Sequence, residues 1–120
     1  MNEAVLVVLE DRRHVALLDA LAQGDYQAAM RLALPFALTG NAYAQALIGA
    51  GYLSGFEGTP PDQIRAWAWT CHAARAGETT AIELLPIIEG MLSSDEIVLA
   101  WRESLSITLK VQERLFRQWR

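Results

Sequence analysis

The sequence predicts an all-α fold and, within that class, a short α-solenoid of antiparallel helix pairs. Composition is the first indication, because 19 Ala and 17 Leu against 6 Val and 7 Ile favour helices over strands. Glycines and capping residues then divide the 120 residues into six apolar segments of helical length. Gly40 and Gly77 each close a predicted helix and are 37 residues apart. Helix pairs that recur every roughly 30 to 45 residues are typical of repeat proteins.

The first predicted helix begins at Glu3 or Asp11 and ends at Gln23, where Gly24 supplies a C-cap. Its Val-rich beginning, residues 4–9, has a short strand as the alternative interpretation. This apolar run is flanked by acids and lacks the basic start and cleavage site of a secretion signal.

The second helix is predicted from Asp25, a good N-cap, to Thr39. Pro35 should kink it, because proline lacks a backbone donor and crowds the preceding turn. After Gly40 and Asn41 the third helix covers residues 42–53. The Gly- and Pro-rich stretch 54–61 reads as a loop.

The last three helices are predicted over residues 62–77, 79–92 and 94–118. Asp62 is the N-cap of the first of them, and Pro86 should bend or break the second. Ser93 and Glu96, three residues apart, form a capping box at the start of the third.

The helix over 62–77 carries two apolar stripes at helical spacing. One holds Ala66, Trp69, Ala73 and Ala76, and the other holds Ile64, Trp67, Ala68, Cys71 and Ala74. A helix with two stripes is packed on both sides. It therefore belongs inside a stacked array or a tight bundle.

One apolar stripe also follows the last helix: Ile97, Val98, Trp101, Leu105, Leu109, Leu115, Phe116 and Trp119. We expect its first half to pack on the helix over 79–92 and its second half to extend past the array. Phe116 and Trp119 would then be exposed, which predicts a homodimer through this C-terminal helix. The alternative is that the helix folds back along the first two helices within one chain.

A motif of small and aromatic residues runs through residues 40–81: Ala44-Gln45-Ala46-Leu47-Ile48-Gly49-Ala50-Gly51-Tyr52, then Gly55, Gly58, Asp62, Ala66, Trp69, Ala73-Ala74 and Gly77. With this motif, residues 40–81 resemble one Sel-one-like repeat, a member of the tetratricopeptide-like superfamily. With its flanking segments the resemblance covers residues 12–105. The chain departs from the family in its loop, which is one residue longer and lacks the family's Val, whose packing we expect Phe56 to replace.

The resemblance divides a single domain, 1–120, into an opening helix pair (12–40), a full repeat (40–78) and closing helices (79–120). It implies a non-catalytic module for protein–protein interaction, an adaptor or regulator of another protein. The alternative is an inhibitor or immunity protein that blocks a toxin or enzyme.

Charge and composition exclude several other functions. The net charge of -4 argues against nucleic acid, whose binders need a basic surface. No apolar run approaches the ~20 residues of a membrane span. Cys71 is the single cysteine, and His14 and His72 lack metal-ligand spacing, so we expect no metal. A cytoplasmic location is expected, with a removed secretion signal as the open alternative.

Catalytic and cofactor patterns are absent from the sequence. The glycines of Gly49-x-Gly51-x-x-x-Gly55 follow an Ala-rich helix instead of a strand, so they indicate helix packing rather than a dinucleotide site. No enzyme activity and no cofactor are expected. The candidate partner-binding residues are polar or aromatic positions off the Ala stripe and at the end of the last helix: Asn41, Tyr43, Gln45, Phe56, Phe116 and Trp119.

Overall fold

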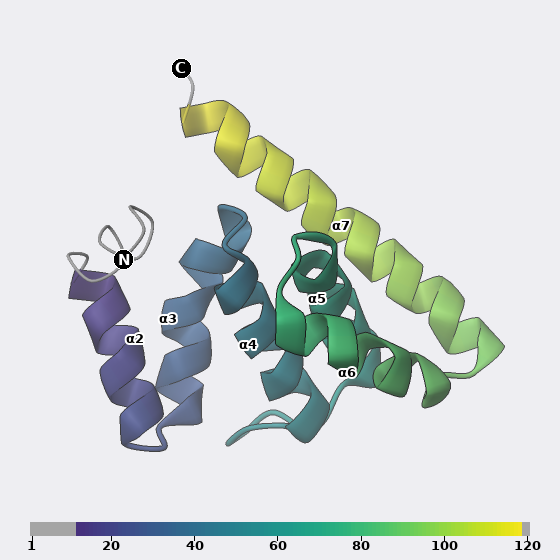
Figure 1. Cartoon of the computed structure of the whole chain (residues 1–120), viewed down its shortest axis with the longest axis horizontal. Coiled ribbons are helices and arrows are strands. Elements are labelled where there is room, and N and C mark those ends of the chain that lie inside the picture. The colour runs from purple at the N-terminus through teal and green to yellow at the C-terminus, as the bar shows by residue number, and fades with distance from the viewer. Residues whose placement is uncertain (1–11, 119–120) are drawn as a thin grey trace.

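The computed structural model describes residues 12–118, which form six α-helices and no strand (Figure 1). The helices are α2 (Arg12–Ala22), α3 (Tyr26–Leu38), α4 (Ala42–Ser54), α5 (Gln63–Arg75), α6 (Thr79–Gly90) and α7 (Ser94–Gln118). The predicted all-α class is confirmed. The choice between helix and strand for residues 4–9 lies outside the part of the chain that is described.

Three of the connections between helices share one backbone design. Gly24, Gly40 and Gly77 end α2, α3 and α5 with φ values of 73°, 92° and 88°, a region that side chains rarely allow. Each glycine N–H donates to the carbonyl three residues earlier, at 3.1, 3.1 and 3.0 Å. These bonds close the helices at the sites that the glycines predict.

The residue after each of these glycines begins the next helix. The side chains of Asp25, Asn41 and Glu78 accept hydrogen bonds from the backbone N–H three residues on, at 3.1, 2.9 and 2.7 Å. Their own N–H groups donate to the carbonyl five residues earlier. At each joint, the glycine and the residue after it thus supply hydrogen-bond partners for the backbone groups at the end of one helix and the start of the next.

The predicted caps of α5 and α7 are also confirmed. Asp62 accepts from the Arg65 N–H at 3.0 Å. At the start of α7, the Ser93 N–H donates to Glu96 Oε1 at 3.0 Å and the Glu96 N–H donates to Ser93 Oγ at 3.2 Å. Both helices with an internal proline, α3 and α6, continue through it, so Pro86 does not break α6.

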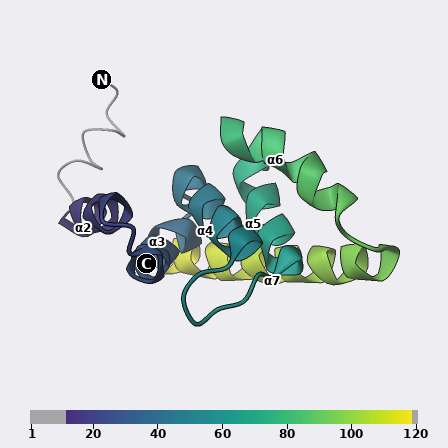
Figure 2. The same ribbon diagram turned by 90° about the horizontal axis from the view of Figure 1, so that it is seen from below.

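From α2 to α6, each helix packs on the next one in the sequence (Figures 1 and 2). The core is built largely from alanines, including Ala29, Ala33, Ala37 and Ala44. Helices α4 and α5 approach each other closely at Gly49, because a β-carbon there would collide with Thr70. Helix α5 is packed on both sides, as its two stripes predict: Trp67 and Trp69 are 1% and 6% exposed.

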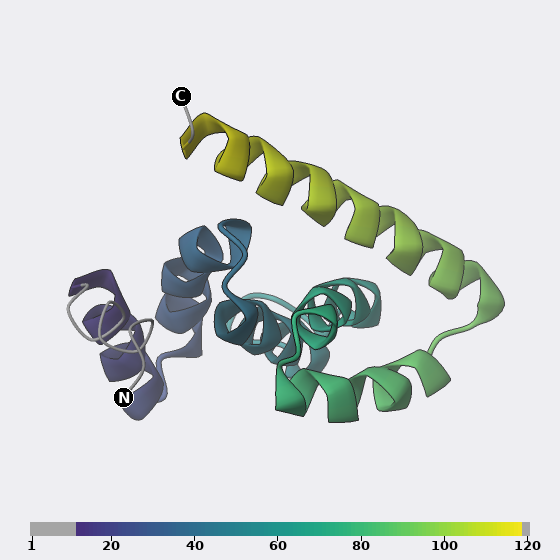
Figure 3. The same ribbon diagram turned by 45° about the horizontal axis from the view of Figure 1, so that its top comes forward.

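Helix α7 turns back across the array and packs on α5 and α3 (Figure 3). The expectation that its first half packs on α6 is therefore wrong. It packs through Ala100, Ser104, Ile107 and Val111, two of which are small, and the Trp101 ring meets the Trp67 ring of α5 at the border of this face. Most of the stripe that the sequence analysis singled out on α7 instead faces solvent.

Candidate partner-binding groove

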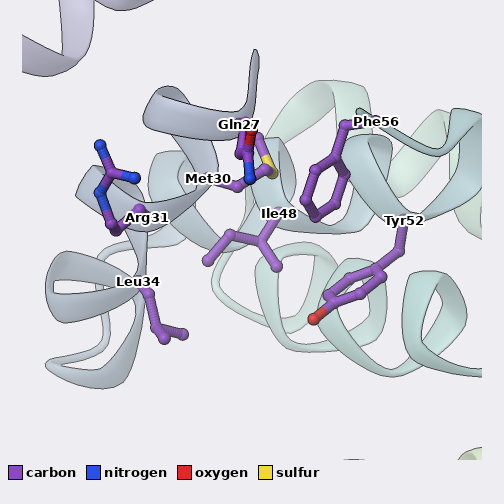
Figure 4. Close-up of a pocket in the computed structure, with 7 residues that line it drawn as sticks. All are labelled: Gln27, Met30, Arg31, Leu34, Ile48, Tyr52 and Phe56. Atoms are coloured by element: carbon purple, nitrogen blue, oxygen red, sulfur yellow. The ribbon is translucent and has the colours of Figure 1, made fainter. Parts of the chain in front are cut away.

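An apolar groove of about 270 Å³ lies between α3, α4 and the loop 55–62 (Figure 4). Its lining residues are Gln27, Met30, Arg31 and Leu34 from α3, Ile48 and Tyr52 from α4, and Phe56 from the loop. A second hollow of about 230 Å³ also borders Met30 and Phe56 and extends to Tyr26 and Leu47. Because the two hollows share these walls, we treat them as one surface, the α3–α4 groove.

The α3 wall of the groove depends on two residues that face each other across the helix contact. Gly51 of α4 lies against the Met30 side chain so closely that a β-carbon on Gly51 would collide with the Met30 sulfur. Met30 is buried, yet it borders both hollows. Methionine is flexible and polarisable, which suits a surface that adapts to apolar ligands.

The loop places Phe56 as the opposite wall. Gly55 turns the chain at φ 76°, and a β-carbon there would lie 2.9 Å from Pro61 Cδ. The Phe56 N–H donates to the Thr59 carbonyl at 3.0 Å, and the reciprocal bond is 2.7 Å. These contacts hold the Phe56 ring against Tyr52, with ring centroids 6.0 Å apart and planes at 62°.

One cation stands at the end of this apolar surface. Arg31 is exposed, and it forms no ion pair with any residue in 12–118. Figure 4 places its guanidinium at the opposite end of the groove from Tyr52 and Phe56, with Leu34 on the same side. The groove can thus hold apolar side chains along its length and a carboxylate at its Arg31 end.

The structure separates the candidate residues that the sequence analysis grouped on one surface. Phe56 lines the groove, whereas Asn41 and Tyr43 lie at the other end of α4, roughly 20 Å away along a 13-residue helix. Asn41 serves as the N-cap of α4, and Tyr43 is exposed. These positions do not form one continuous site.

Gln45 needs a correction, because it is not a surface residue. It is 3% exposed, and its Nε2 donates to the Ala37 carbonyl at 3.1 Å. A buried polar side chain with its partner stabilises the contact between α3 and α4. On α7, Phe116 is exposed, and Trp119 lies beyond the residues that the structure describes.

A polar cluster between α5 and α7 was not predicted. His72 Nε2 lies 2.9 Å from the Ser104 carbonyl and 3.3 Å from both Ser104 Oγ and Thr108 Oγ1. A carbonyl only accepts, so Nε2 carries the hydrogen and cannot take a proton from either hydroxyl. In this arrangement the imidazole holds α7 in place instead of activating a nucleophile.

Burial also disfavours ionisation of the neighbouring Cys71 thiol. Desolvation raises the pKa of Cys71, and this effect outweighs the opposing attraction of Arg75. Within residues 12–118, no three His, Cys, Asp or Glu side chains are arranged to hold a metal ion. No helix in the same range combines the length and apolarity needed to cross a bilayer.

The sequence analysis missed most of the groove. In the sequence, Met30, Leu34, Ile48 and Tyr52 look like ordinary core positions of two helices, and only the packing of α3 on α4 brings them together beside Phe56 as one lining. The contact between Gly51 and Met30 of α3 also marks the groove, but it can be recognised only once the pairing of α3 with α4 is known. The chain shows no significant match to a protein-family model, a curated protein sequence or a solved structure.

Proposed function

We propose that the protein is a non-catalytic interaction module that binds a short apolar segment of another protein in the α3–α4 groove. The observation that carries the proposal is the groove itself, in which Met30, Tyr52 and Phe56 form an adaptable apolar lining. Aromatic side chains at the centre of a contact often supply much of its binding energy. An acidic side chain in the bound segment would pair with Arg31.

The proposal includes membership of the Sel-one-like repeats and a short solenoid architecture. Its support is the shared design of the joints at Gly24, Gly40 and Gly77, together with the burial of Trp69 at the core position that the motif assigns to it. We further propose a cytoplasmic location, where a free cysteine such as Cys71 is common.

Affinity capture with variants of the full chain tests the groove. Leu34→Glu puts a charge in the groove at an exposed position, and Ile82→Glu makes the same change on α6 as the matched control. We expect Ile82→Glu to retain the bound protein and Leu34→Glu to lose it, with unchanged circular dichroism for both. Retention by Leu34→Glu would contradict the assignment of the groove.

An inhibitor or immunity protein is the second proposed function, and the net charge of -4 favours it because many enzyme clefts that bind anionic polymers are basic. The activity of the captured protein distinguishes the two. An adaptor leaves that activity intact at saturating concentrations, whereas an inhibitor abolishes it at a one-to-one ratio.

A further inference from the structure

The hollow that Figure 4 shows has the size of a site for a side chain. Its volume of about 270 Å³ lies below the roughly 300–1,000 Å³ of pockets that hold small molecules. The Tyr52 and Phe56 rings close one end, Ile48 lies between the ends, and the Arg31 guanidinium stands at the other. The hollow therefore suits one large apolar side chain beside the two rings and an anionic group near Arg31.

The walls of the groove offer few hydrogen-bond partners to the backbone of a bound segment. The Tyr52 carbonyl accepts from the Asp62 N–H at 2.8 Å, and Phe56 exchanges two backbone bonds with Thr59. The other wall residues lie within α3 and α4, where N–H and carbonyl groups pair along the helix. The polar side chains of the lining are those of Gln27, Arg31 and Tyr52. An extended segment would thus bury most of its N–H and carbonyl groups without partners, whereas a helix pairs them internally.

We propose that the segment bound in the α3–α4 groove is an amphipathic helix. It packs one large apolar side chain against Tyr52 and Phe56, and it pairs an Asp or Glu, three or four positions away, with Arg31. Residues at this spacing share one face of a helix, with β-carbons roughly 5–6 Å apart, whereas residues of an extended segment share a face at a spacing of two. This inference rests on the proposed function, because it specifies the ligand of the same groove.

Charge complementarity assigns an acidic helix to the groove. Arg31 is exposed and forms no ion pair within residues 12–118. The arginine beside the other end of the groove, Arg65, is already engaged, because it pairs with Asp62 and Glu103 and lies 5.9 Å from the centre of the Tyr52 ring. Of these two arginines, Arg31 is thus the one that can pair with a ligand, and a guanidinium binds a carboxylate through two parallel hydrogen bonds.

Selection on the full chain from a phage-displayed library of random peptides of about 12 residues, three turns of helix, tests the proposal. We expect the enriched peptides to share a large apolar residue and an Asp or Glu three or four positions from it. On Arg31→Glu, Lys or Arg should replace the acid at that spacing. Arg114→Glu makes the same change at an exposed position of α7 outside the groove, and it should enrich the wild-type pattern. An acid at a spacing of two, or an unchanged charge preference on Arg31→Glu, would overturn the proposal.

One enriched peptide, synthesised with a fluorophore, tests the bound conformation directly. Proline at a position between its apolar and acidic residues breaks a helix, whereas alanine there favours one. In fluorescence anisotropy, we expect the proline peptide to bind at least about tenfold more weakly than the alanine peptide. Equal affinities of the two peptides would exclude a bound helix.

The Leu34→Glu chain separates failure of this inference from failure of the proposed function. Peptides that lose binding to Leu34→Glu occupy the groove, so an extended pattern among them would refute the helix and leave the groove as an interaction site. Peptides that bind Leu34→Glu as tightly as the wild type lie outside the groove and would contradict both.

Discussion

Trp101 of α7 meets Trp67 of α5 edge to face, with ring centroids 4.9 Å apart and planes at 63°. The Arg75 guanidinium stands 5.3 Å from the centre of the same Trp101 ring. The half-exposed ring of Trp101 thus connects the outer surface of α7 to Trp67, the largest fully buried side chain among the residues that the structure describes. This contact is one of those that hold α7 on α5.

The tryptophan pair predicts unequal losses of stability. Trp67→Ala should lower the free energy of unfolding by about 3–5 kcal/mol, because it empties a buried site. Trp101→Ala should cost about 1–2 kcal/mol, since half of its ring is already in water. Urea denaturation followed by circular dichroism measures both. The double variant should reveal a coupling of about 0.5–1.5 kcal/mol, and strictly additive losses would argue against a direct ring contact.

Two glycines of α4 should respond differently to the same substitution. Gly49→Ala should destabilise by about 1–3 kcal/mol, because the new methyl group meets backbone atoms of α5 at 3.0 and 3.3 Å. Gly51→Ala meets only the flexible Met30 side chain, and its better helix propensity of about 1 kcal/mol offsets that contact. Thermal denaturation compares the two. Equal midpoints would contradict the close approach of α4 and α5 at Gly49.

The His72 contacts predict a local effect on α7. His72→Ala should cost about 1–2 kcal/mol and increase hydrogen exchange in the middle of α7, because the hydrogen bond from the imidazole to the Ser104 carbonyl, which joins α5 to α7, is lost. Gln112→Ala, at an exposed position of the same helix, is the control and should change neither quantity. Unchanged exchange in His72→Ala would exclude the histidine as a support for α7.

Burial of Cys71 predicts slow alkylation and a defined dependence on pH. The raised pKa keeps the thiol protonated, so iodoacetamide should react much more slowly with the native protein than with protein in urea. The unfolded chain ionises first as the pH rises past the ordinary thiol pKa of about 8.5, so this group's contribution to stability declines there. With Cys71→Ala, the free energy of unfolding should fall less steeply as the pH rises through this range. Equal alkylation rates in both states would contradict the burial.

The sequence predicts the helix boundaries well because caps are local chemistry. Asp25, Asp62 and the Ser93–Glu96 box each act within three residues, and the structure contains all of them. Prediction from local sequence fails at Gln45. Its polarity suggested a surface position, but the acceptor that satisfies it, the Ala37 carbonyl, comes from another helix.

The packing of helix α7 is a second case that depends on contacts between residues distant in sequence. Its periodicity marks a stripe of large apolar residues, and packing on α5 instead selects the face that holds Ala100 and Ser104. Which face a neighbouring helix takes depends on side chains that are distant in sequence, here Trp67 and His72. The α3–α4 groove likewise could not be predicted from the sequence, because its walls come from two helices and a loop.

The joints after Gly24, Gly40 and Gly77 restrict how the molecule can change shape. Each passes from one helix to the next within three residues, with both helix ends hydrogen-bonded, so neighbouring helices have little freedom to tilt. The eight residues between α4 and α5 are the longest connection within 12–118, and they carry Phe56. If the groove binds a segment of another protein as proposed, a bulkier segment would meet α3 and α4 walls that stay where they are. The size range of acceptable partners would then be determined by how far the Phe56 side chain can move.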